Sequence, residues 1–201
     1  MQSPRANNSL GFEAQLAASV PERRVVLLAP ATSYRIADFL NAARALDVGV
    51  TVGSNHRQTL EGLSCGGTMT VDLTNCERGV AQIVEFDRDK PIAAIVAIDE
   101  GATIVAAAAS ETLGLPHNSL ASVVAAGNKH RMRVALRDSG LASPKFSIAA
   151  LDDGHKAVMR HVNYPCVLKP LSLSASRGVI RANDDAEFVA AFARIAAMLR
   201  T

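Results

Sequence analysis

The sequence of 201 residues contains no tryptophan, and only 4% of its residues are aromatic. With so few large rings, small and branched aliphatic side chains must fill the core, as in helices packed on a parallel sheet. Cysteine is scarce too: the three cysteines, Cys65, Cys76 and Cys166, are far apart and form no CxxC pair. This spacing excludes a zinc-finger site and a disulfide framework, and it favours reduced thiols in a cytoplasmic protein.

Long uninterrupted apolar runs are missing as well. The most apolar stretch, residues 92–115, is interrupted by Asp99, Glu100 and a further glutamate, which excludes a membrane-spanning helix. Residues 1–23 lack the apolar segment of a secretory signal, and we expect a flexible tail with a short helix at residues 13–19. The net charge is only +2 with the two signs interleaved, so no nucleic acid or membrane partner is indicated.

Strand and helix patterns alternate over residues 24–120, which we interpret as the first domain. Short apolar runs bounded by charges, proline or glycine predict strands at residues 24–30, 47–55, 68–73 and 91–98. Helical spacing predicts helices at residues 36–46 and 79–86, and an alanine-rich helix that ends at Leu113. The last strand is almost wholly apolar, as is typical of a strand covered on both faces. This alternation predicts an α/β domain with a parallel, Rossmann-like sheet.

The pattern changes after Ser119, and we predict a second, α+β domain over residues 121–201. Its predicted helices lie at residues 120–138, 153–161 and 184–199, and its predicted short strands at residues 145–149, 165–169 and 178–181. Asp184 and Asp185 near the start of the last helix, and Arg200 at its end, match the helix dipole.

The first domain lacks the glycines of a dinucleotide site. In such a site, glycines after the first strand let backbone N–H groups approach the pyrophosphate. Here that turn reads APATS at residues 29–33, and Pro30 has no N–H to donate. A Rossmann NAD(P)-binding protein is therefore the less favoured alternative. Asp99 and Glu100, at the carboxyl end of the fourth strand, either lie on the substrate side or cap the next helix.

Residues 163–179 carry the clearest chemical signal and read NYPCVLKPLSLSASRGV. An apolar strand presents Lys169 at its end, where a rigid backbone can hold an ammonium against a phosphate. The small residues that follow leave room for backbone N–H groups to close over phosphate oxygens. The predicted loop residues are Ser172, Ser174, Ala175, Ser176, Arg177 and Gly178. The alternative is a surface hairpin whose lysine protects a strand edge.

A second lysine strengthens the phosphate interpretation. Lys129 opens the helical run KHRMRVAL, 40 positions before Lys169. Taken alone, Lys129 is most simply a solvated helix charge. The combination of the two lysines, with the turn and strand GLASPKF between them, indicates a phosphate site more specifically than either lysine alone.

The order of these segments resembles the ATP-grasp superfamily, weakly before Ile98 and specifically after it. The likeness is carried by IDEGATIVAAAASETLGLPHNS, GNKHRMRVALRDSGLASPKF and YPCVLKPLSLSASRGVIRANDDAEF. It implies a preATP-grasp Rossmann-like domain followed by the N-terminal lobe of an ATP-grasp domain. It also implies that Lys129 and Lys169 contact the phosphates of ATP, that residues 172–178 form the flexible phosphate loop, and that Val179 lies against the adenine.

Two departures from the family pattern affect this prediction. Biotin-carboxylase-like members have a run of glycines where this chain has serines, and the serine form looks more like the amino-acid ligase and carboxylate–amine ligase branches. Leu173 is unusual even among those. We also expect the chain to stop before the family's adenine-reading hinge, its Mg²⁺ ligands and its substrate-binding arginines, so no metal ligand is assigned.

The resemblance implies that the complete enzyme transfers the γ-phosphate of ATP to a carboxylate, after which an amine displaces phosphate. The chain itself is expected to bind ATP weakly without turnover. It is also expected to form a homodimer through an apolar face made by Cys166, Leu168 and Val179. The alternative from another class is a non-catalytic nucleotide-binding or interaction module. The histidines and serines show neither a metalloprotease spacing nor a nucleophile elbow.

Overall fold

The computed structural model describes residues 24–31, 33–56, 67–173 and 175–200. It divides into two compact units, unit 1 at residues 1–119 and unit 2 at residues 120–201. The expected N-terminal tail and its short helix lie outside the described residues, as do Cys65 and Ser174. Within the described ranges, no helix is long and apolar enough to cross a membrane.

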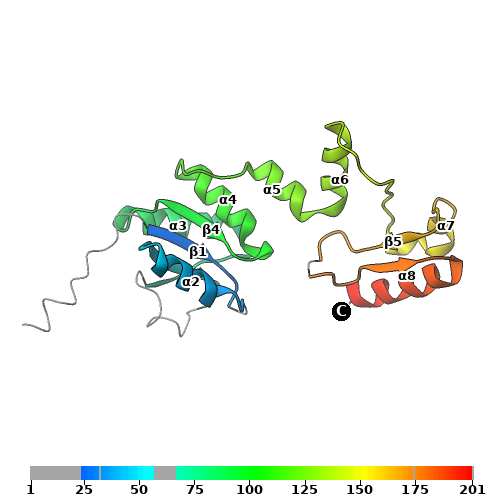
Figure 1. Ribbon diagram of the computed structural model, residues 1–201, viewed down its shortest axis with the longest axis horizontal. Helices are drawn as coiled ribbons and strands as arrows, with labels where there is room; N and C mark the ends of the chain where they lie inside the picture. The colour runs from blue at the N-terminus through cyan, green and yellow to red at the C-terminus, as the bar shows by residue number, and fades with distance from the viewer. Residues whose placement is uncertain (1–23, 32, 57–66, 174, 201) are drawn as a thin grey trace, which may run out of the picture. The chain divides into compact units, whose positions relative to one another are not determined.

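Unit 1 is built on a four-stranded parallel sheet with the strand order β3-β2-β1-β4 (Figure 1). The strands are β1 (Arg24–Leu28), β2 (Gly49–Ser54), β3 (Thr68–Thr70) and β4 (Ala94–Ala97). The helices are α2 (Ile36–Ala45), α3 (Cys76–Asp89) and α4 (Thr103–Thr112), the last preceded by the 3₁₀ turn η1 (Glu100–Ala102). The predicted parallel α/β sheet is confirmed.

Two apolar clusters cover the two faces of this sheet. On one face Leu28 of β1 belongs to a cluster with Ile83 of α3 and Val105 of α4. On the other face Leu27 belongs to a cluster with Leu40 of α2. Neighbouring residues of a strand point to opposite faces, so β1 contributes to both cores. This double burial explains why its sequence is apolar without alternation.

Strand β4 lies at the edge of the sheet, and the prediction that both of its faces are covered is wrong. Val96 is 37% exposed. It pairs with Leu27 and so faces the α2 side, but it lies outside the cluster there. The apolar composition of this segment comes partly from Ile92 and Ile98, which are buried just beyond the two ends of the strand.

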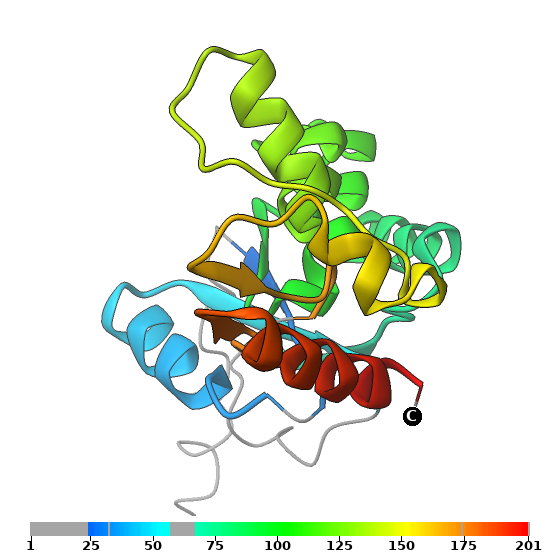
Figure 2. The same ribbon diagram turned by 90° about the vertical axis from the view of Figure 1, so that its right-hand side faces the viewer.

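Unit 2 combines a two-stranded antiparallel sheet with helices, as the predicted α+β class requires. Its strands are β5 (Cys166–Leu168) and β6 (Ile180–Ala182). Its helices are α5 (Leu120–Gly127), α6 (Lys129–Asp138), α7 (His155–Met159) and α8 (Asp185–Leu199), with a 3₁₀ turn η2 (Leu151–Asp153). Helix α8 lies along the two strands (Figure 2) and buries Phe188, Ala191 and Ile195.

Two predicted elements of unit 2 differ from the structure. The single helix predicted at residues 120–138 is two helices, because Asn128 adopts an extended conformation and caps a new helix. Residues 145–149, all described, form no strand, and Ile148 within them is 55% exposed. A strand needs a hydrogen-bonded neighbour, and residues 145–149 belong to neither of the two sheets.

Candidate functional site

Lys129 binds the loop that follows Lys169 through both its side chain and its backbone. Its Nζ donates to the carbonyl of Leu173 at 2.6 Å and to that of Leu171 at 3.4 Å. Its backbone N–H also donates to the Leu171 carbonyl, at 3.0 Å. Lys129 is 42 residues from Leu171 in the sequence, and Leu171 is only two residues beyond Lys169. The structure thus brings the two predicted lysines to one loop.

The first turn of α6 has its backbone donors satisfied. Asn128 Oδ1 accepts from the N–H groups of His130 and Arg131, and the Asn128 carbonyl accepts from Met132. The Lys129 N–H donates to Leu171 and the Asn128 N–H donates to the carbonyl of Ala125, so the four N–H groups that a helix leaves without intrahelical partners are all bonded. Sequence reasoning missed Asn128, although asparagine directly before a helical run is a typical N-cap.

Lys169 follows β5 directly and lies on the outer face of the β5–β6 sheet. Side chains alternate along a strand, so Lys169 shares its face with Val167, which pairs with Arg181. Val167 is 55% exposed and Val179 is 45% exposed, and Lys169 and Arg181 are exposed as well. The outer face therefore combines two exposed valines with two cations. Val167 was not among the predicted residues, although its spacing from Lys169 could have indicated it.

The apolar face predicted from Cys166, Leu168 and Val179 is not one face. Cys166 pairs with Ala182 and Leu168 pairs with Ile180, so these residues share the inner side of the sheet, where Ala182 is fully buried. Burial raises the pKa of the Cys166 thiol, which agrees with this position. Val179 precedes Ile180 and points to the opposite side. The expected grouping was wrong because it ignored the alternation of side chains.

The predicted phosphate loop has unusual backbone geometry. Ala175 and Ser176 both have positive φ, at 52° and 58°, which is uncommon for residues with a side chain. Gly178 has φ 71°, and a Cβ there would lie 2.9 Å from Pro170 Cγ. The predicted residues Ser172, Ala175, Ser176 and Arg177 are exposed, whereas Ser174 lies outside the described residues. Backbone strain of this kind concentrates at functional sites.

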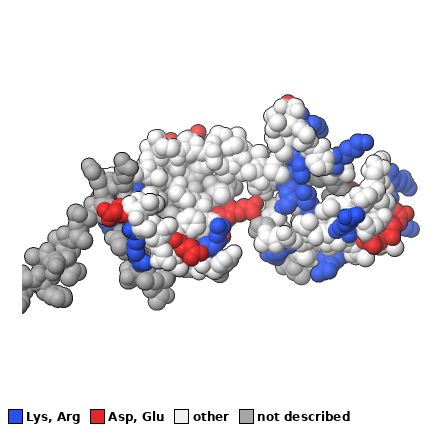
Figure 3. All heavy atoms as spheres, viewed as in Figure 1, with Lys and Arg blue, Asp and Glu red and all other residues white. Residues whose placement is uncertain are grey.

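The two units carry opposite net charges, contrary to the even distribution inferred from the sequence. Residues 120–201 contain 12 Lys and Arg against six Asp and Glu, whereas residues 1–119 contain nine against 13. Figure 3 shows basic side chains gathered on the visible face of unit 2, around α6. The net charge of +2 for the whole chain hides this difference, because the opposite net charges of the two units largely cancel. Unit 2 therefore suits an anionic ligand.

Asp99 and Glu100 belong to unit 1 and follow β4 at the carboxyl edge of the sheet. Asp99 precedes η1 but makes no side-chain cap, and its Oδ2 is buried without a hydrogen-bond partner among the described residues. The same holds for Ser33 Oγ in the loop after β1, the strand next to β4. The strand order reverses between β1 and β4, and open α/β sheets bind ligands outside such a point. The helix-capping alternative for Asp99 is wrong.

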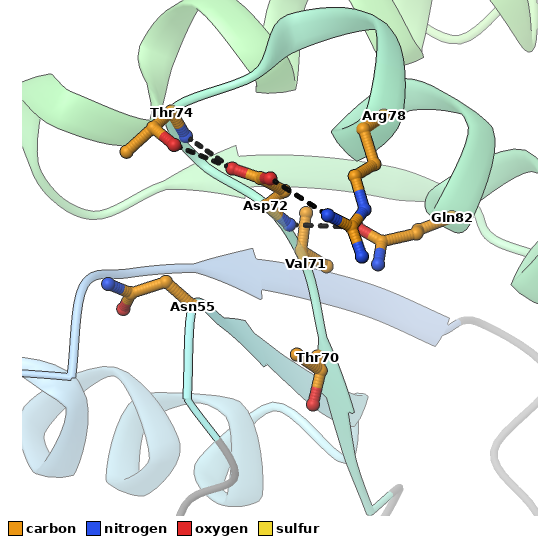
Figure 4. Close-up of a pocket in the computed structure, with 7 residues that line it drawn as sticks. All are labelled: Asn55, Thr70, Val71, Asp72, Thr74, Arg78 and Gln82. Atoms are coloured by element: carbon orange, nitrogen blue, oxygen red, sulfur yellow. Dashed lines mark hydrogen bonds and ion pairs between the residues drawn. The ribbon is translucent and has the colours of Figure 1, made fainter.

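A pocket of about 270 Å³ lies elsewhere on unit 1, at the carboxyl ends of β2 and β3 (Figure 4). Its lining residues are Asn55, Thr70, Val71, Asp72, Thr74, Arg78 and Gln82, none of which was predicted as a site residue. Asp72 Oδ1 accepts from the Thr74 hydroxyl and from the N–H groups of Thr74 and Asn75, and these bonds lower the pKa of Asp72. This carboxylate therefore orders its own loop.

The resemblance also implies Mg²⁺, and the described residues do not offer a site for it. None of their His, Cys, Asp and Glu side chains form a group of three or more that could hold a metal ion. The donors that surround the predicted phosphate loop are cationic or hydroxyl groups, whereas Mg²⁺ takes carboxylate oxygens.

Two family models match the chain in order. One, the ATP-grasp N-terminal domain, matches residues 40–117, and the other, the ATP-grasp domain, matches residues 162–201. Among curated proteins, the chain is similar to the formate-dependent phosphoribosylglycinamide formyltransferase of Anaeromyxobacter dehalogenans. The two are 35% identical over 69 residues, which are 33% of this chain and 18% of that protein.

Solved structures share the fold. The L-amino acid ligase of Bacillus licheniformis has a TM-score of 0.69 at 21% identity, over 87% of this chain and 42% of that one. N5-carboxyaminoimidazole ribonucleotide synthetase, solved as an ADP complex, has a TM-score of 0.66 at 11% identity, over 88% and 45%. The enzyme of Aspergillus clavatus, solved with ADP and 5-aminoimidazole ribonucleotide, has a TM-score of 0.62 at 18% identity, over 86% and 44%.

This chain thus spans less than half the length of the proteins it resembles. The likenesses to solved structures, all below 25% identity, concern the fold alone. The two family models together match more than half of the chain, and their order along it is that of the two units described above. The chain belongs to the ATP-grasp superfamily.

Proposed function

We propose that this chain supplies the N-terminal domain and part of the nucleotide-binding lobe of an ATP-dependent ligase that joins a carboxylate to an amine. One observation carries the proposal: Lys129 donates to the carbonyls of Leu171 and Leu173, in the glycine-poor loop that begins directly after Lys169, 40 residues further along the sequence. The net positive charge of unit 2 supports a polyanionic ligand there.

In this proposal the outer face of the β5–β6 sheet takes the nucleotide. Lys169 binds phosphate oxygens, and the exposed Val179 and Val167 lie against the adenine. Lys129 binds phosphate from the first turn of α6. The loop residues Ser172, Ser174, Ala175, Ser176, Arg177 and Gly178 cover the phosphates. ATP has an anionic triphosphate and an apolar adenine. The outer face has cations for the first and exposed valines for the second.

The proposed reaction proceeds in two steps. A carboxylate oxygen attacks the γ-phosphorus of ATP, ADP leaves, and an acyl-phosphate forms. An amine nitrogen then attacks the acyl carbon, inorganic phosphate leaves, and the nitrogen loses a proton. The two lysines would stabilise the charge on the transferring phosphoryl group and hold it in position, which supplies most of the catalysis in such transfers.

We place the second substrate of the complete enzyme at the carboxyl edge of the sheet in unit 1. Asp99 and Glu100 follow β4 there, and two buried oxygens, Ser33 Oγ and Asp99 Oδ2, lack partners among the described residues. The acidic side chains at this edge suit a ligand with hydrogen-bond donors, such as an amine. This position agrees with the tendency of open sheets to bind ligands where the strand order reverses.

Thermal unfolding of the 201-residue chain with and without ATP tests the nucleotide site. At 100 times its Kd, ATP would stabilise the chain by about 2.7 kcal/mol. We expect Lys129→Met and Lys169→Met each to remove most of this shift, and the exposed Lys145→Met in the same unit to keep it. An unchanged melting temperature in the wild type would favour the non-catalytic interaction module. A shift with NAD(P) but not with ATP would favour the dinucleotide alternative.

We also propose that the 201-residue chain binds ATP without turning it over. The resemblance places the metal ligands of the family after the segments found in this sequence. A phosphate-release assay on the purified chain checks this, and robust ATP hydrolysis would contradict it.

A further inference from the structure

The Lys129 ammonium, which we propose to bind ATP phosphate, donates to two carbonyls of the protein's own backbone. Lys129 Nζ donates to the carbonyls of Leu173 at 2.6 Å and Leu171 at 3.4 Å. The Lys129 N–H adds a third bond, to the Leu171 carbonyl at 3.0 Å. Residues 171–173 are therefore held against the first turn of α6 at two carbonyls.

The position of Lys129 in this contact is fixed from the helix side. Asn128 starts α6 by accepting from His130 N–H and Arg131 N–H, so Lys129 is the first helical residue and not a residue on a loop. Lys129 is half-buried. Its hydrogen bond to Leu173 is charge-assisted, and such bonds are about twice as strong as neutral ones.

The other end of the same loop is anchored independently. Gly178 lies against Pro170, where a Cβ would come within 2.9 Å of Cγ and 3.0 Å of Cδ, and Pro170 is buried. Residues 171–173 thus follow the buried, anchored Pro170 and are also hydrogen-bonded to Lys129. Loss of the two Nζ bonds would leave residues 171–173 held to α6 by one backbone bond, while Pro170 stays in place.

We infer that Lys129 is a latch: without nucleotide it holds residues 171–173 against α6, and nucleotide phosphate releases them by competing for the same ammonium. The first half stands on the hydrogen bonds alone, and the second half rests on the proposed function. A phosphate oxygen carries a formal negative charge and the Leu173 carbonyl does not, so the ammonium is better stabilised by the phosphate. The protonated amine would thereby couple occupancy of the site to the conformation of the loop.

Backbone ¹⁵N relaxation of the 201-residue chain without nucleotide tests the latch. In Lys129→Met the heteronuclear NOE of Leu171, Ser172 and Leu173 is expected to fall, because the three bonds to α6 reduce to the backbone one. In Lys145→Met, an exposed lysine of unit 2, the same values are expected to stay at wild-type level. Unchanged values at these three residues in Lys129→Met would overturn the latch, whether or not ATP binds.

Addition of ATP tests the competition. In the wild type, saturating ATP is expected to remove the ¹H–¹H NOE cross-peaks between Leu173 and the first turn of α6, because the loop leaves α6 to cover the phosphates. If ATP shifts resonances of unit 2 but leaves Leu171 and Leu173 held, the competition is wrong while the nucleotide site stands. If ATP shifts no resonance, the proposed function fails and the competition fails with it. The nucleotide-free result then still decides whether Lys129 holds the loop.

Discussion

The two units differ in how much of their structure is held by an apolar core. In unit 1, the central strand β1 and its neighbour β2 are almost wholly buried, and clusters lie on both faces of the sheet. In unit 2, helices α5 and α6 bury none of their residues, and the apolar packing lies mainly between α8 and the two strands. Unit 1 therefore owes its stability to packing, and unit 2 depends more on caps, turns and polar contacts. Ligand binding should be felt most in unit 2, because its elements are held by fewer buried contacts.

The largest expected difference between the units comes from removing a core side chain. Leu28→Ala in β1 should lower the free energy of unfolding by about 3 kcal/mol, because Leu28 is fully buried and the sheet cannot close the cavity. The matched aliphatic truncation in unit 2, Val167→Ala, should cost less than about 0.5 kcal/mol, since Val167 is 55% exposed. Urea unfolding followed by circular dichroism measures both. Equal losses would show that the contrast between the units is wrong.

The next largest expected loss of stability lies in unit 2, at the close contact between Gly178 and Pro170. Gly178→Ala should destabilise the chain by about 2 kcal/mol, because the new Cβ meets Pro170 and the residue must keep φ 71°. Gly140 has almost the same φ, 72°, but a Cβ there meets nothing within 4 Å. Gly140→Ala should therefore cost only the conformational part, about 1 kcal/mol. Equal losses of stability for the two variants would remove the packing role assigned to Gly178.

The helix caps of the two units should differ by a smaller amount. Asn128→Ala should cost about 1.5 kcal/mol, because Asn128 Oδ1 accepts from two N–H groups of α6. Asn75, the cap of α3 in unit 1, accepts only from Arg78 N–H, and α3 is held by its core as well, so Asn75→Ala should cost about 0.7 kcal/mol. The same unfolding measurement decides the order of the two, and the reverse order would contradict the dependence of unit 2 on caps.

The last expected contrast appears only at alkaline pH and concerns unit 2. Burial, and then the neighbouring Asp185 carboxylate, raise the pKa of Tyr164 from its ordinary value of 10.0 to about 12. The folded state therefore keeps the proton more tightly than the unfolded state, and stability present below pH 10.0 is lost as the pH rises towards 12. Tyr164→Phe should show a shallower loss of melting temperature over this range. Parallel curves for wild type and variant would show that Tyr164 does not contribute.

The sequence was a good guide where one element decides its own structure. The apolar run of β1 and the spacing of α2 follow from side chains within each segment, and both elements formed within a few residues of the expected bounds. The order of the strands in the sheet could not be predicted in the same way. The composition of residues 91–98 could not show that β4 lies at an edge, because strand order depends on which neighbours pair.

The side chains of the candidate site could be predicted from the sequence, but its backbone hydrogen bonds could not. Lys129 and Lys169 could be singled out by their surroundings in the sequence, although their role stays a prediction. The hydrogen-bond partners of Lys129 could not be predicted from the sequence. Leu171 and Leu173 accept through their backbone carbonyls, which every residue has. The break before Lys129 was hidden by the apolar spacing of Met132 and Leu136, which continues the helical pattern of α5.

The positive φ angles of Ala175 and Ser176 have a consequence for how the loop responds to a ligand. A glycine at either position would reach such angles at no steric expense, but it would also sample many other shapes when the loop is free. Side chains restrict that sampling, so a loop built from alanine and serine forfeits less chain entropy when a ligand orders it. Substituting glycine at both positions should thus relax the empty loop and weaken binding through entropy, with no loss of any direct contact.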